Sequence, residues 1–307
     1  MTTTDMPASD ASVDVDVIDE EEESTAPKRK LGVAFWIAAG WVISISLLAA
    51  LAGFLPIEDP DQIGAGAPRD GMFGDNLLGT DALGRDVFAR TIYGARISLG
   101  VGFIGIILGV IVGGSLGILA GYFKGVVDQV ISFVFFSLLS FPALVLALLL
   151  ISAVVDEETS SFASFLIVAV TLGILGIAPI GRLARATTVQ FAEREFVQAA
   201  RVIGAQNGRI IIKELLPMVL IPMGALTLLG MGISIVAEGS LAFLGLSVQG
   251  EAISWGKSIV DGSQTRDLEQ NAHVAFVPII TMFLTVAALN FCGDRVREYF
   301  DVRETAF

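Results

Sequence analysis

The sequence predicts an all-α polytopic membrane protein with six transmembrane helices and both termini in the cytoplasm. Hydrophobic residues make up 54% of the 307 positions, charged residues make up 17%, and the mean hydropathy is +0.74. A soluble globule of this size carries more polar surface. Six apolar runs are long enough to cross a bilayer, and the segments between them differ in their content of lysine and arginine.

The first 30 residues are set apart by their charge. Nine of the 32 acidic residues lie before Ser24, and the remaining 23 acids against 19 lysines and arginines leave a net charge of −4 instead of −13. Such a segment, without apolar periodicity, buries too little surface to offset its ordering entropy. We expect residues 1–30 to be a disordered acidic cytoplasmic tail, with cation binding or a basic partner as alternatives. Residues 31–307 are expected to form the transmembrane domain.

The first apolar run follows Lys28, Arg29 and Lys30 directly. It is about 25 residues long, which exceeds the core of a signal peptide and suits an uncleaved spanning helix. Hydropathy predicts six spans in all: 31–55, 97–121, 130–154, 162–181, 218–244 and 274–292.

Basic residues set the predicted orientation, because short cytoplasmic loops carry an excess of lysine and arginine. With the N-terminus inside, the inner segments hold these residues: Lys28, Arg29, Lys30, Lys124, Arg182, Arg185, Arg194, Arg201, Arg209, Lys213, Arg295, Arg297 and Arg303. The outer segments hold fewer: Arg69, Arg85, Arg90, Arg96, Lys257 and Arg266. This imbalance favours cytoplasmic termini, and it places residues 182–217 in the cytoplasm.

Residues 182–217 form a polar and basic island between the fourth and fifth spans. Apolar residues in its middle follow a helical period: Ala192, Phe196, Ala199, Ala200 and Ile203. The pattern predicts an amphipathic helix with these residues on its apolar face. Gly204 is expected to end that helix, Asn207 to cap a second short helix, and Pro217 to close it.

Five glycines in the second span recur every four residues: Gly105, Gly109, Gly113, Gly117 and Gly121. They form a smooth stripe along one side of a helix, where another backbone can approach closely. We expect helix packing there. A helix of the same chain is favoured over one from another chain.

The longest connection between spans, residues 56–96, has charges of alternating sign at Asp81, Arg85, Asp86 and Arg90. Local ion pairs or an interfacial helix are expected there. Aromatic residues near the predicted ends of spans are typical of interfacial anchors: Tyr93, Tyr122, Trp255 and Tyr299.

Motifs for enzyme chemistry are missing from the sequence. Trp255 to Ser258 resembles the end of a phosphate-binding loop, but Glu251 stands where that loop needs glycine. His273 is the single histidine and Cys292 the single cysteine, which leaves no metal cluster and no disulfide. Cys292 is expected to be a small buried hydrophobe. We expect no catalytic residues and no metal site.

Glu238 is the ionisable residue that stands out within the spans, near the outer end of the fifth. A buried charge there is costly unless it is paired or faces water. Two roles stay open: a place in a translocation path or gate, and the capping of a nearby backbone break. Secondary carriers usually need more membrane carboxylates than this chain has, so an autonomous carrier or channel is less favoured.

Several motifs together resemble permease subunits of bacterial ABC importers. The island matches their pattern of Glu-Ala-Ala, glycine and Leu-Pro with Gln198-Ala199-Ala200, Gly204 and Leu216-Pro217. The second permease of the dipeptide, oligopeptide and nickel group is similar over nearly all of residues 78–303. The matching pieces are LGTDALGRD, RTIYGARISLG, GYFKGVVDQ, FPAL, FVQAARVIGA, SLAFLGLSVQ, SWG and NFCGDRVREYFDVR.

The resemblance implies a type I ABC importer permease fold and a non-catalytic membrane subunit. Such a subunit pairs with a homologous permease as a heterodimer in the bacterial inner membrane, with two cytoplasmic ATPases and an extracytoplasmic substrate-binding protein. It contacts membrane lipid and no nucleic acid. The partner ATPases bind ATP and Mg²⁺, and this chain binds no cofactor.

The family's ATPase contact is a short helix after the conserved glycine, which inserts into a groove of the ATPase. Carried onto this sequence, the contact comprises Gln198, Ala199, Ala200, Gly204, Ala205 and Arg209. Gln198 replaces the family's glutamate and Glu214 its histidine, so the charges at the contact differ from the pattern. Met218 and Val302 depart from its asparagine and proline.

Peptides are the expected substrates, with nickel, haem or another small solute as alternatives. The outer connection at 247–273 is a candidate contact for the binding protein or its cargo.

Overall fold

The computed structural model describes residues 31–74, 76–156, 158–250 and 252–304, with side chains through Phe300. The acidic tail predicted at residues 1–30 lies outside the described residues. The described part is helical apart from its loops and one isolated bridge between Thr80 and Asp86. Its elements are α1 Gly32–Leu51, η1 Ala52–Phe54, α2 Val87–Phe123, α3 Gly125–Leu139, α4 Ala143–Ser152, α5 Ser161–Ala192, α6 Glu195–Val202, α7 Asn207–Arg209, η2 Ile210–Leu215, α8 Leu216–Phe243, α9 Trp255–Gly262, α10 Thr265–Gln270 and α11 His273–Glu304.

In the described part of the chain, five helices are long and apolar enough to cross a membrane, and the α3–α4 pair makes a sixth crossing if it counts as one span. The single span expected at 130–154 is wrong as a straight helix, because α3 and α4 meet at 87°. Pro142 precedes α4 and cannot donate the hydrogen bond that would continue α3. Hydropathy measures apolar content and is blind to such a bend.

Two other spans are longer than hydropathy predicted. Helix α2 begins at Val87, ten residues before the expected start at Ile97, because Asp86 caps it by accepting hydrogen bonds from the amides of Phe88 and Ala89. Helix α5 runs on to Ala192, so the first part of the predicted polar island is a continuation of a spanning helix. In both helices, polar residues lower the hydropathy near one end, although the helical hydrogen bonds continue through them.

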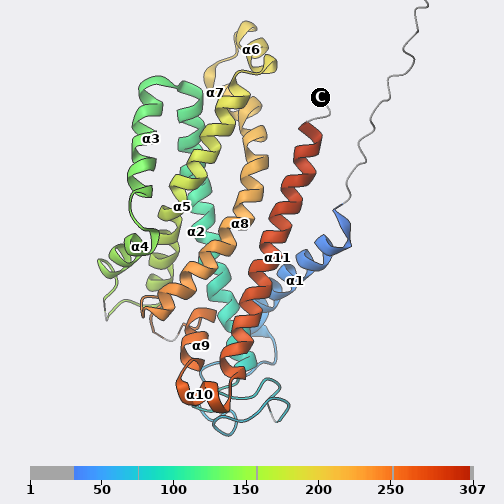
Figure 1. The fold of residues 1–307 in the computed structure, drawn as a ribbon, viewed down its shortest axis with the longest axis vertical. Helices are drawn as coiled ribbons and strands as arrows, with labels where there is room; N and C mark the ends of the chain where they lie inside the picture. Colours follow the sequence, from blue (N-terminus) through green and yellow to red (C-terminus); the bar gives the residue numbers. More distant parts are fainter. Residues whose placement is uncertain (1–30, 75, 157, 251, 305–307) are drawn as a thin grey trace, which may run out of the picture. The chain divides into compact units, whose positions relative to one another are not determined.

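Helices α2 and α5 lie side by side along the centre of the bundle (Figure 1). All five glycines of the stripe face α5. A Cβ atom at Gly105 would come within 3.1 Å of the Ala169 carbonyl oxygen, and one at Gly121 within 2.8 Å of the Arg185 carbonyl oxygen. The glycines between them approach the backbone or side chains of Gly176, Ile177, Ile180, Gly181 and Ala184. The partner of the stripe is therefore a helix of the same chain, and its lack of side chains lets the two backbones meet.

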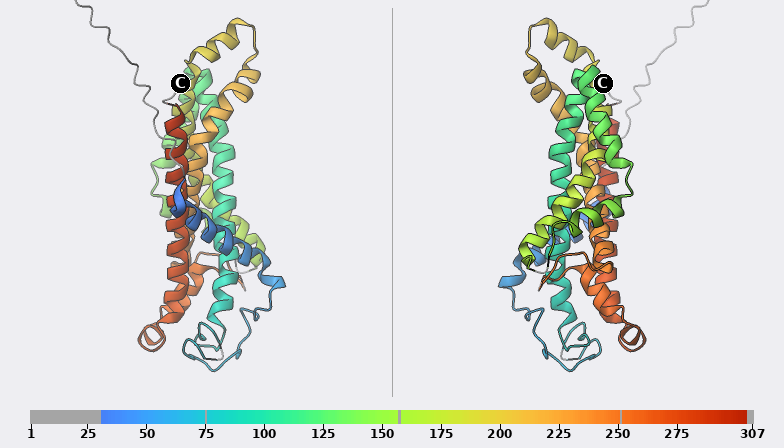
Figure 2. Two further views of the ribbon diagram at one scale, coloured as in Figure 1. Left: turned by 90° about the vertical axis from the view of Figure 1, so that its right-hand side faces the viewer. Right: turned by 90° about the vertical axis from the view of Figure 1, so that its left-hand side faces the viewer.

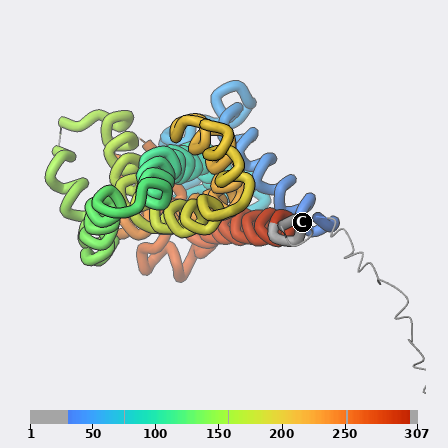
Figure 3. Tube along the Cα trace, turned by 90° about the horizontal axis from the view of Figure 1, so that it is seen from above, coloured from blue at the N-terminus to red at the C-terminus, as the bar shows by residue number. Residues whose placement is uncertain are grey.

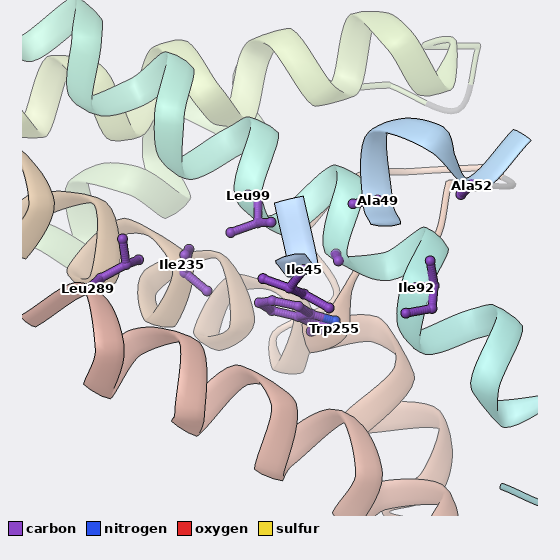
Figure 4. Packing of buried hydrophobic residues seen from close by; sticks show 9 residues of the cluster. Ile45, Ala49, Ala52, Ile92, Leu99, Ile235, Trp255 and Leu289 are labelled. Atoms are coloured by element: carbon purple, nitrogen blue, oxygen red, sulfur yellow. The ribbon is translucent and has the colours of Figure 1, made fainter. Parts of the chain in front are cut away.

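The remaining helices flank this central pair. Viewed from above, α3 and α4 lie at one edge of the bundle and α1 with α11 at the other (Figure 3). One side chain cluster joins α1, α2, α8, α9 and α11 around the fully buried Trp255 (Figure 4). Trp255 and Tyr122 are therefore buried against protein instead of exposed as anchors, although Tyr122 lies at the end of α2 as expected, where it is 8% exposed in another cluster.

The two ends of the bundle are built from different elements. The α6–α7 segment caps one end, and the loop 57–86 with α9 and α10 forms the other (Figures 1 and 2). We call the second end the outer cap, defined as residues 57–86 and 255–270. The spanning helices thus separate the α6–α7 segment from the outer cap.

Candidate functional site

The α6–α7 segment, residues 193–215, begins with α6, a helix whose C-terminal end is capped by backbone hydrogen bonds. Glu195 in the first turn of α6 and Arg201 in its last turn both complement the helix dipole. The helix ends at Gly204, which has a φ of 87°. The Gly204 amide donates to the Arg201 carbonyl, and the Ala205 amide donates to the Ala200 carbonyl, each at 3.0 Å. These two bonds form a Schellman motif, so Gly204 ends the helix as predicted.

The inner face of α6 is displaced from the predicted one. Val197 is fully buried, and it packs with other apolar residues of the segment and its neighbours: Tyr122, Phe191, Ala192, Ile210 and Leu215. Phe196, Ala199 and Ile203, which were expected on the apolar face, are exposed. Ala192 and Ala200 do face the cluster as predicted, but Val197 takes the inward position predicted for Phe196, since both residues are apolar.

Exposed apolar side chains stand at the turn after α6. Val202 is 88% exposed and Ile203 is 86% exposed. Adjacent apolar residues this far out of the core mark an interaction surface more often than chance exposure does. The sequence prediction expected neither residue to be exposed in this way, because the periodicity assigned Ile203 to the apolar face and gave Val202 no role.

The six residues predicted for the ATPase contact divide into two sets. Gln198, Ala199, Gly204 and Arg209 are exposed, whereas Ala200 and Ala205 are half-buried against the Val197 cluster. Among the described residues, Arg209 has no ion-pair partner. We define the docking surface as Gln198, Ala199, Val202, Ile203, Gly204 and Arg209. It presents small, apolar and basic groups together.

The helix after the turn does not end at Pro217. Asn207 is its first residue and no cap, and it continues through η2 and α8 to Phe243. Residues Ile210–Leu215 are wound as a π-helix, in which the Leu216 amide donates to the Ile211 carbonyl. This wider turn accommodates the ring of Pro217, which lacks an amide proton. The segment is therefore rigidly continuous with α8.

Charged pairs hold the segment and its surroundings. Lys124 donates to Glu193 Oε1 at 2.7 Å, and this hydrogen bond lowers the pKa of the Glu193 carboxyl. Arg185 of α5 donates to Asp128 of α3 from Nη2 to Oδ2 at 2.6 Å and also from Nε to Oδ1. The planar guanidinium suits this two-point contact, which fixes α3 against α5.

Glu238 lies at the centre of a buried polar node on α8. It is fully buried, and its carboxylate accepts hydrogen bonds from Ser98 of α2, at 3.1 Å, and from Ser247. Ser98 in turn accepts from the Trp255 amide at 3.1 Å. The node ties α2 and α8 to the loop that leads into α9.

The surroundings of Glu238 bear on its two open roles. Cavities of about 810 and 490 Å³ occur among the described residues, and Glu238 lines neither. Gly256 packs against it closely enough that a Cβ there would lie 3.5 Å from Glu238 Oε2. This geometry favours the role of holding irregular backbone over a place in a path.

The outer cap is held by long-range ion pairs. Arg90 is buried, and its Nη2 lies 2.8 Å from Asp261 Oδ2 of α9, with Asp61 and Asp81 also nearby. Arg69 Nε lies 2.7 Å from Asp267 Oδ1 of α10. The predicted local pair also forms, between Arg85 and Asp81 at 2.6 Å.

The interfacial helix expected within 56–96 does not occur among the described residues of that segment, where the first α-helix is α2 from Val87. Gly84 has a φ of 73°, and a Cβ atom there would lie 2.6 Å from the Gly66 carbonyl oxygen. Lys257 donates to the Gly250 carbonyl at 2.7 Å, and burial lowers the pKa of its ammonium group. No cluster of three or more possible metal ligands occurs among the residues that the structure describes.

Comparison with known proteins gives one family. A family model described as "Binding-protein-dependent transport system inner membrane component" matches residues 105–305. The dipeptide transport system permease protein DppC of Alkalihalophilus pseudofirmus is 32% identical over 210 residues. The glutathione transport system permease protein GsiD of Pectobacterium atrosepticum is 33% identical over 208 residues. Each match covers 68% of this chain and 66% of the relative, just under two thirds of its length.

Among solved structures, the chain is similar to the MetNI methionine ABC transporter in inward-facing conformations. Two crystal forms match with TM-scores of 0.52 and 0.54 at 20% sequence identity. The matches cover 68% and 69% of this chain, and 96% and 97% of the matched chains. At this identity the likeness shows the fold alone, and it is the type I importer permease fold that the sequence predicted.

Proposed function

Because this chain belongs to the family of binding-protein-dependent transport system inner membrane components, we propose that it is the permease subunit of an ATP-driven importer of short peptides. It forms part of a translocation pathway and leaves ATP hydrolysis to partner subunits. Its expected partners are a homologous permease, two cytoplasmic ATPases and an extracytoplasmic substrate-binding protein. ATP and Mg²⁺ bind to the ATPases in this proposal.

The docking surface carries the proposal. Val202 and Ile203 protrude beside small residues and the unpaired Arg209, on a turn whose other face is fixed by the Val197 cluster. Small residues allow close backbone approach, apolar ones gain from burial, and the guanidinium offers a rigid fork of donors. A partner with an apolar groove rimmed by acids fits this surface, and the ATPase subunit is that partner.

The direction of transport rests on the orientation of the chain. The distribution of basic residues favours a cytoplasmic position for the docking surface, next to the ATPases. The outer cap then faces the binding protein, and its segment 247–273 is the proposed contact with that protein or its cargo. Both termini are cytoplasmic in this arrangement.

Peptide substrates are supported by the names of the two relatives, which transport dipeptides and glutathione. Nickel, haem or another small solute is the alternative within the same class of importer. An autonomous channel or secondary carrier is the alternative outside it.

Reconstitution tests the proposal. Proteoliposomes with the whole complex should take up a labelled dipeptide only when ATP and the loaded binding protein are both present. Flux through this polypeptide alone, without ATP, would establish a channel or carrier instead. Binding proteins that purify with bound nickel or haem and no peptide would overturn the substrate.

The docking surface is tested separately by Arg209→Glu. Since Arg209 has no partner in the described chain, its reversal should leave folding intact and reduce ATPase co-purification and uptake by about tenfold or more. Arg266→Glu, an exposed reversal on α10 at the opposite end, is the matched control and should retain the ATPases. Equal co-purification by both variants would contradict the assignment.

A further inference from the structure

Tyr122 lies near the end of α2, beneath the α6–α7 segment, and touches both halves of that segment. We propose that Tyr122 is a positioning residue that fastens the docking surface to α2, so that a displacement of the surface moves α2 and α5 together. The inference rests on the proposed function, since it requires that an ATPase moves this surface.

Two polar contacts join Tyr122 to opposite sides of the Gly204 turn. Its hydroxyl donates to Asn207 Oδ1 at 2.9 Å, at the start of α7. The guanidinium carbon of Arg201, in the last turn of α6, lies 5.4 Å from the centre of its ring. The Tyr122 side chain thus contacts both α6 and α7. The docking residues Val202, Ile203 and Gly204 lie in the sequence between these two contacts.

The Tyr122 ring is also part of the apolar cluster under the segment. It is 8% exposed, and it packs with residues of α5, α6 and η2: Phe191, Ala192, Val197, Ile210 and Leu215. A cation over an aromatic face gains strength when the ring is shielded from water. The packing therefore fixes the ring where Arg201 and Asn207 can reach it.

The connections of the chain explain why α2 needs this side chain. Helix α5 leads into α6 across Glu193 and Arg194, and η2 continues directly into α8, so the backbone transmits movement to both. Helix α2 has no such covalent link. Among the described residues, its polar contacts with the segment come from Tyr122 and, at the residue after the helix, from Lys124 bound to Glu193.

Contacts between α2 and α5 next to Tyr122 mean that a movement of α2 also moves α5. Its neighbour Gly121 lies against the Arg185 carbonyl and Thr188 of α5, at the end of the glycine stripe. Because the stripe brings the two backbones together along their length, α2 and α5 move as one body. The far end of α2 reaches the outer cap, where Arg90 binds Asp261 of α9, and Ser98 of α2 donates to Glu238 of α8.

The test measures peptide transported per ATP hydrolysed in the reconstituted complex. Tyr122→Phe removes the bond to Asn207 alone and should lower that ratio about threefold, the effect of one neutral hydrogen bond. Tyr122→Leu also removes the ring beneath Arg201 and should lower it about tenfold. Tyr93→Phe, which loses a hydrogen bond to the Ala52 carbonyl at the other end of α2, is the matched control and should keep the wild-type ratio.

Further variants separate positioning from loss of structure. Asn207→Ala should lower the ratio as Tyr122→Phe does, and the double variant should be no worse than either, because both remove one bond. Arg201→Lys should retain more of the ratio than Arg201→Gln, because it keeps the cation over the ring. ATPase co-purification should stay at the wild-type level in all of them.

Three outcomes would overturn the inference: an unchanged ratio in Tyr122→Leu, fully additive losses in the double variant, or a loss of co-purified ATPase in proportion to uptake. Each is distinct from failure of the proposed function, which would appear in the wild-type complex as an absence of ATP-dependent peptide uptake. The Tyr122 variants therefore test the inference only after the wild-type complex has been shown to take up peptide with ATP.

Discussion

The outer cap and the docking surface finish the two ends of the bundle in opposite ways. At the outer cap, Arg69 pairs with Asp267 of α10, and Arg90 of α2 pairs with Asp261 of α9. At the docking surface, Val202 and Ile203 stay in solvent beside an unpaired Arg209. Ion pairs between distant segments hold the outer cap, whereas the docking surface has groups that gain free energy when a partner covers them.

This difference has a measurable consequence. Substitutions in the outer cap and its supporting core should lower stability, because they leave buried groups without partners. Substitutions on the docking surface should lower association with the ATPases and leave stability nearly unchanged. Four predictions test this contrast, in order of decreasing effect on stability.

Trp255→Ala should have the largest effect. Trp255 is fully buried at the base of the outer cap, and its Nε1 donates to the Thr91 carbonyl at 2.9 Å. Removing so large a side chain costs about 3–5 kcal/mol. Trp36→Ala is the matched control, since Trp36 of α1 is 67% exposed. Thermal unfolding of the detergent-purified protein should separate the two, and similar melting temperatures would contradict the packing shown in Figure 4.

Arg90→Met should cost slightly less. The substitution leaves Arg85 as the remaining cation beside the buried Asp81 and the half-buried Asp261, and breaking a buried ion pair costs about 3 kcal/mol. Arg96→Met removes a nearby exposed arginine of the same helix that has no ion-pair partner in the described chain. Denaturant titration should show a lower midpoint for Arg90→Met alone. If Arg96→Met were equally destabilising, the ion pairs would not be what holds the cap.

Gly113→Ala should lower stability by an intermediate amount. It tests the packing of α2 against α5, the helix pair that joins the two ends of the bundle. A Cβ at Gly113 collides with the Ile177 carbonyl of α5, and overpacking of this kind costs about 1–3 kcal/mol. Gly224→Ala on α8 has open space around its Cβ and should stabilise slightly through helix propensity. Opposite shifts in melting temperature are expected. Shifts of the same sign would mean that the stripe does not make a close contact.

Ile203→Asp should have the smallest effect on stability and a clear effect on coupling. The side chain is 86% exposed, so unfolding should change by less than about 0.5 kcal/mol. Placing a charge in an apolar interface should reduce ATPase co-purification about tenfold or more. Ile63→Asp, also exposed but in the outer cap, should retain the ATPases. A large loss of stability in Ile203→Asp would show that this residue belongs to the core.

Some errors of the sequence prediction have local physical causes. Pro142 breaks a run that hydropathy reads as one span, and Pro217 is passed by a π-helical turn where a helix end was expected. In α6, Phe196 and Val197 both fit an apolar period, so the sequence does not decide which of them faces inward. In the structure Val197 faces inward, where it packs with Tyr122 and Leu215 of distant segments.

The sequence by itself determined what depends on neighbours along the chain. Hydropathy marked the membrane helices, the four-residue period of the glycines marked a close helix contact, and Gly204 marked the end of α6. The motifs also identified the family. These features follow from backbone geometry and residue type within one or two helical turns.

Only the tertiary structure decided which distant groups meet. Arg90 pairs with Asp261 across 171 positions, Glu238 accepts from Ser98 across 140, and Tyr122 donates to Asn207 across 85. No period or spacing encodes these partners, because their distances depend on how whole helices pack. The same packing buries Trp255 in the core, although the sequence favoured a position for it at the membrane interface.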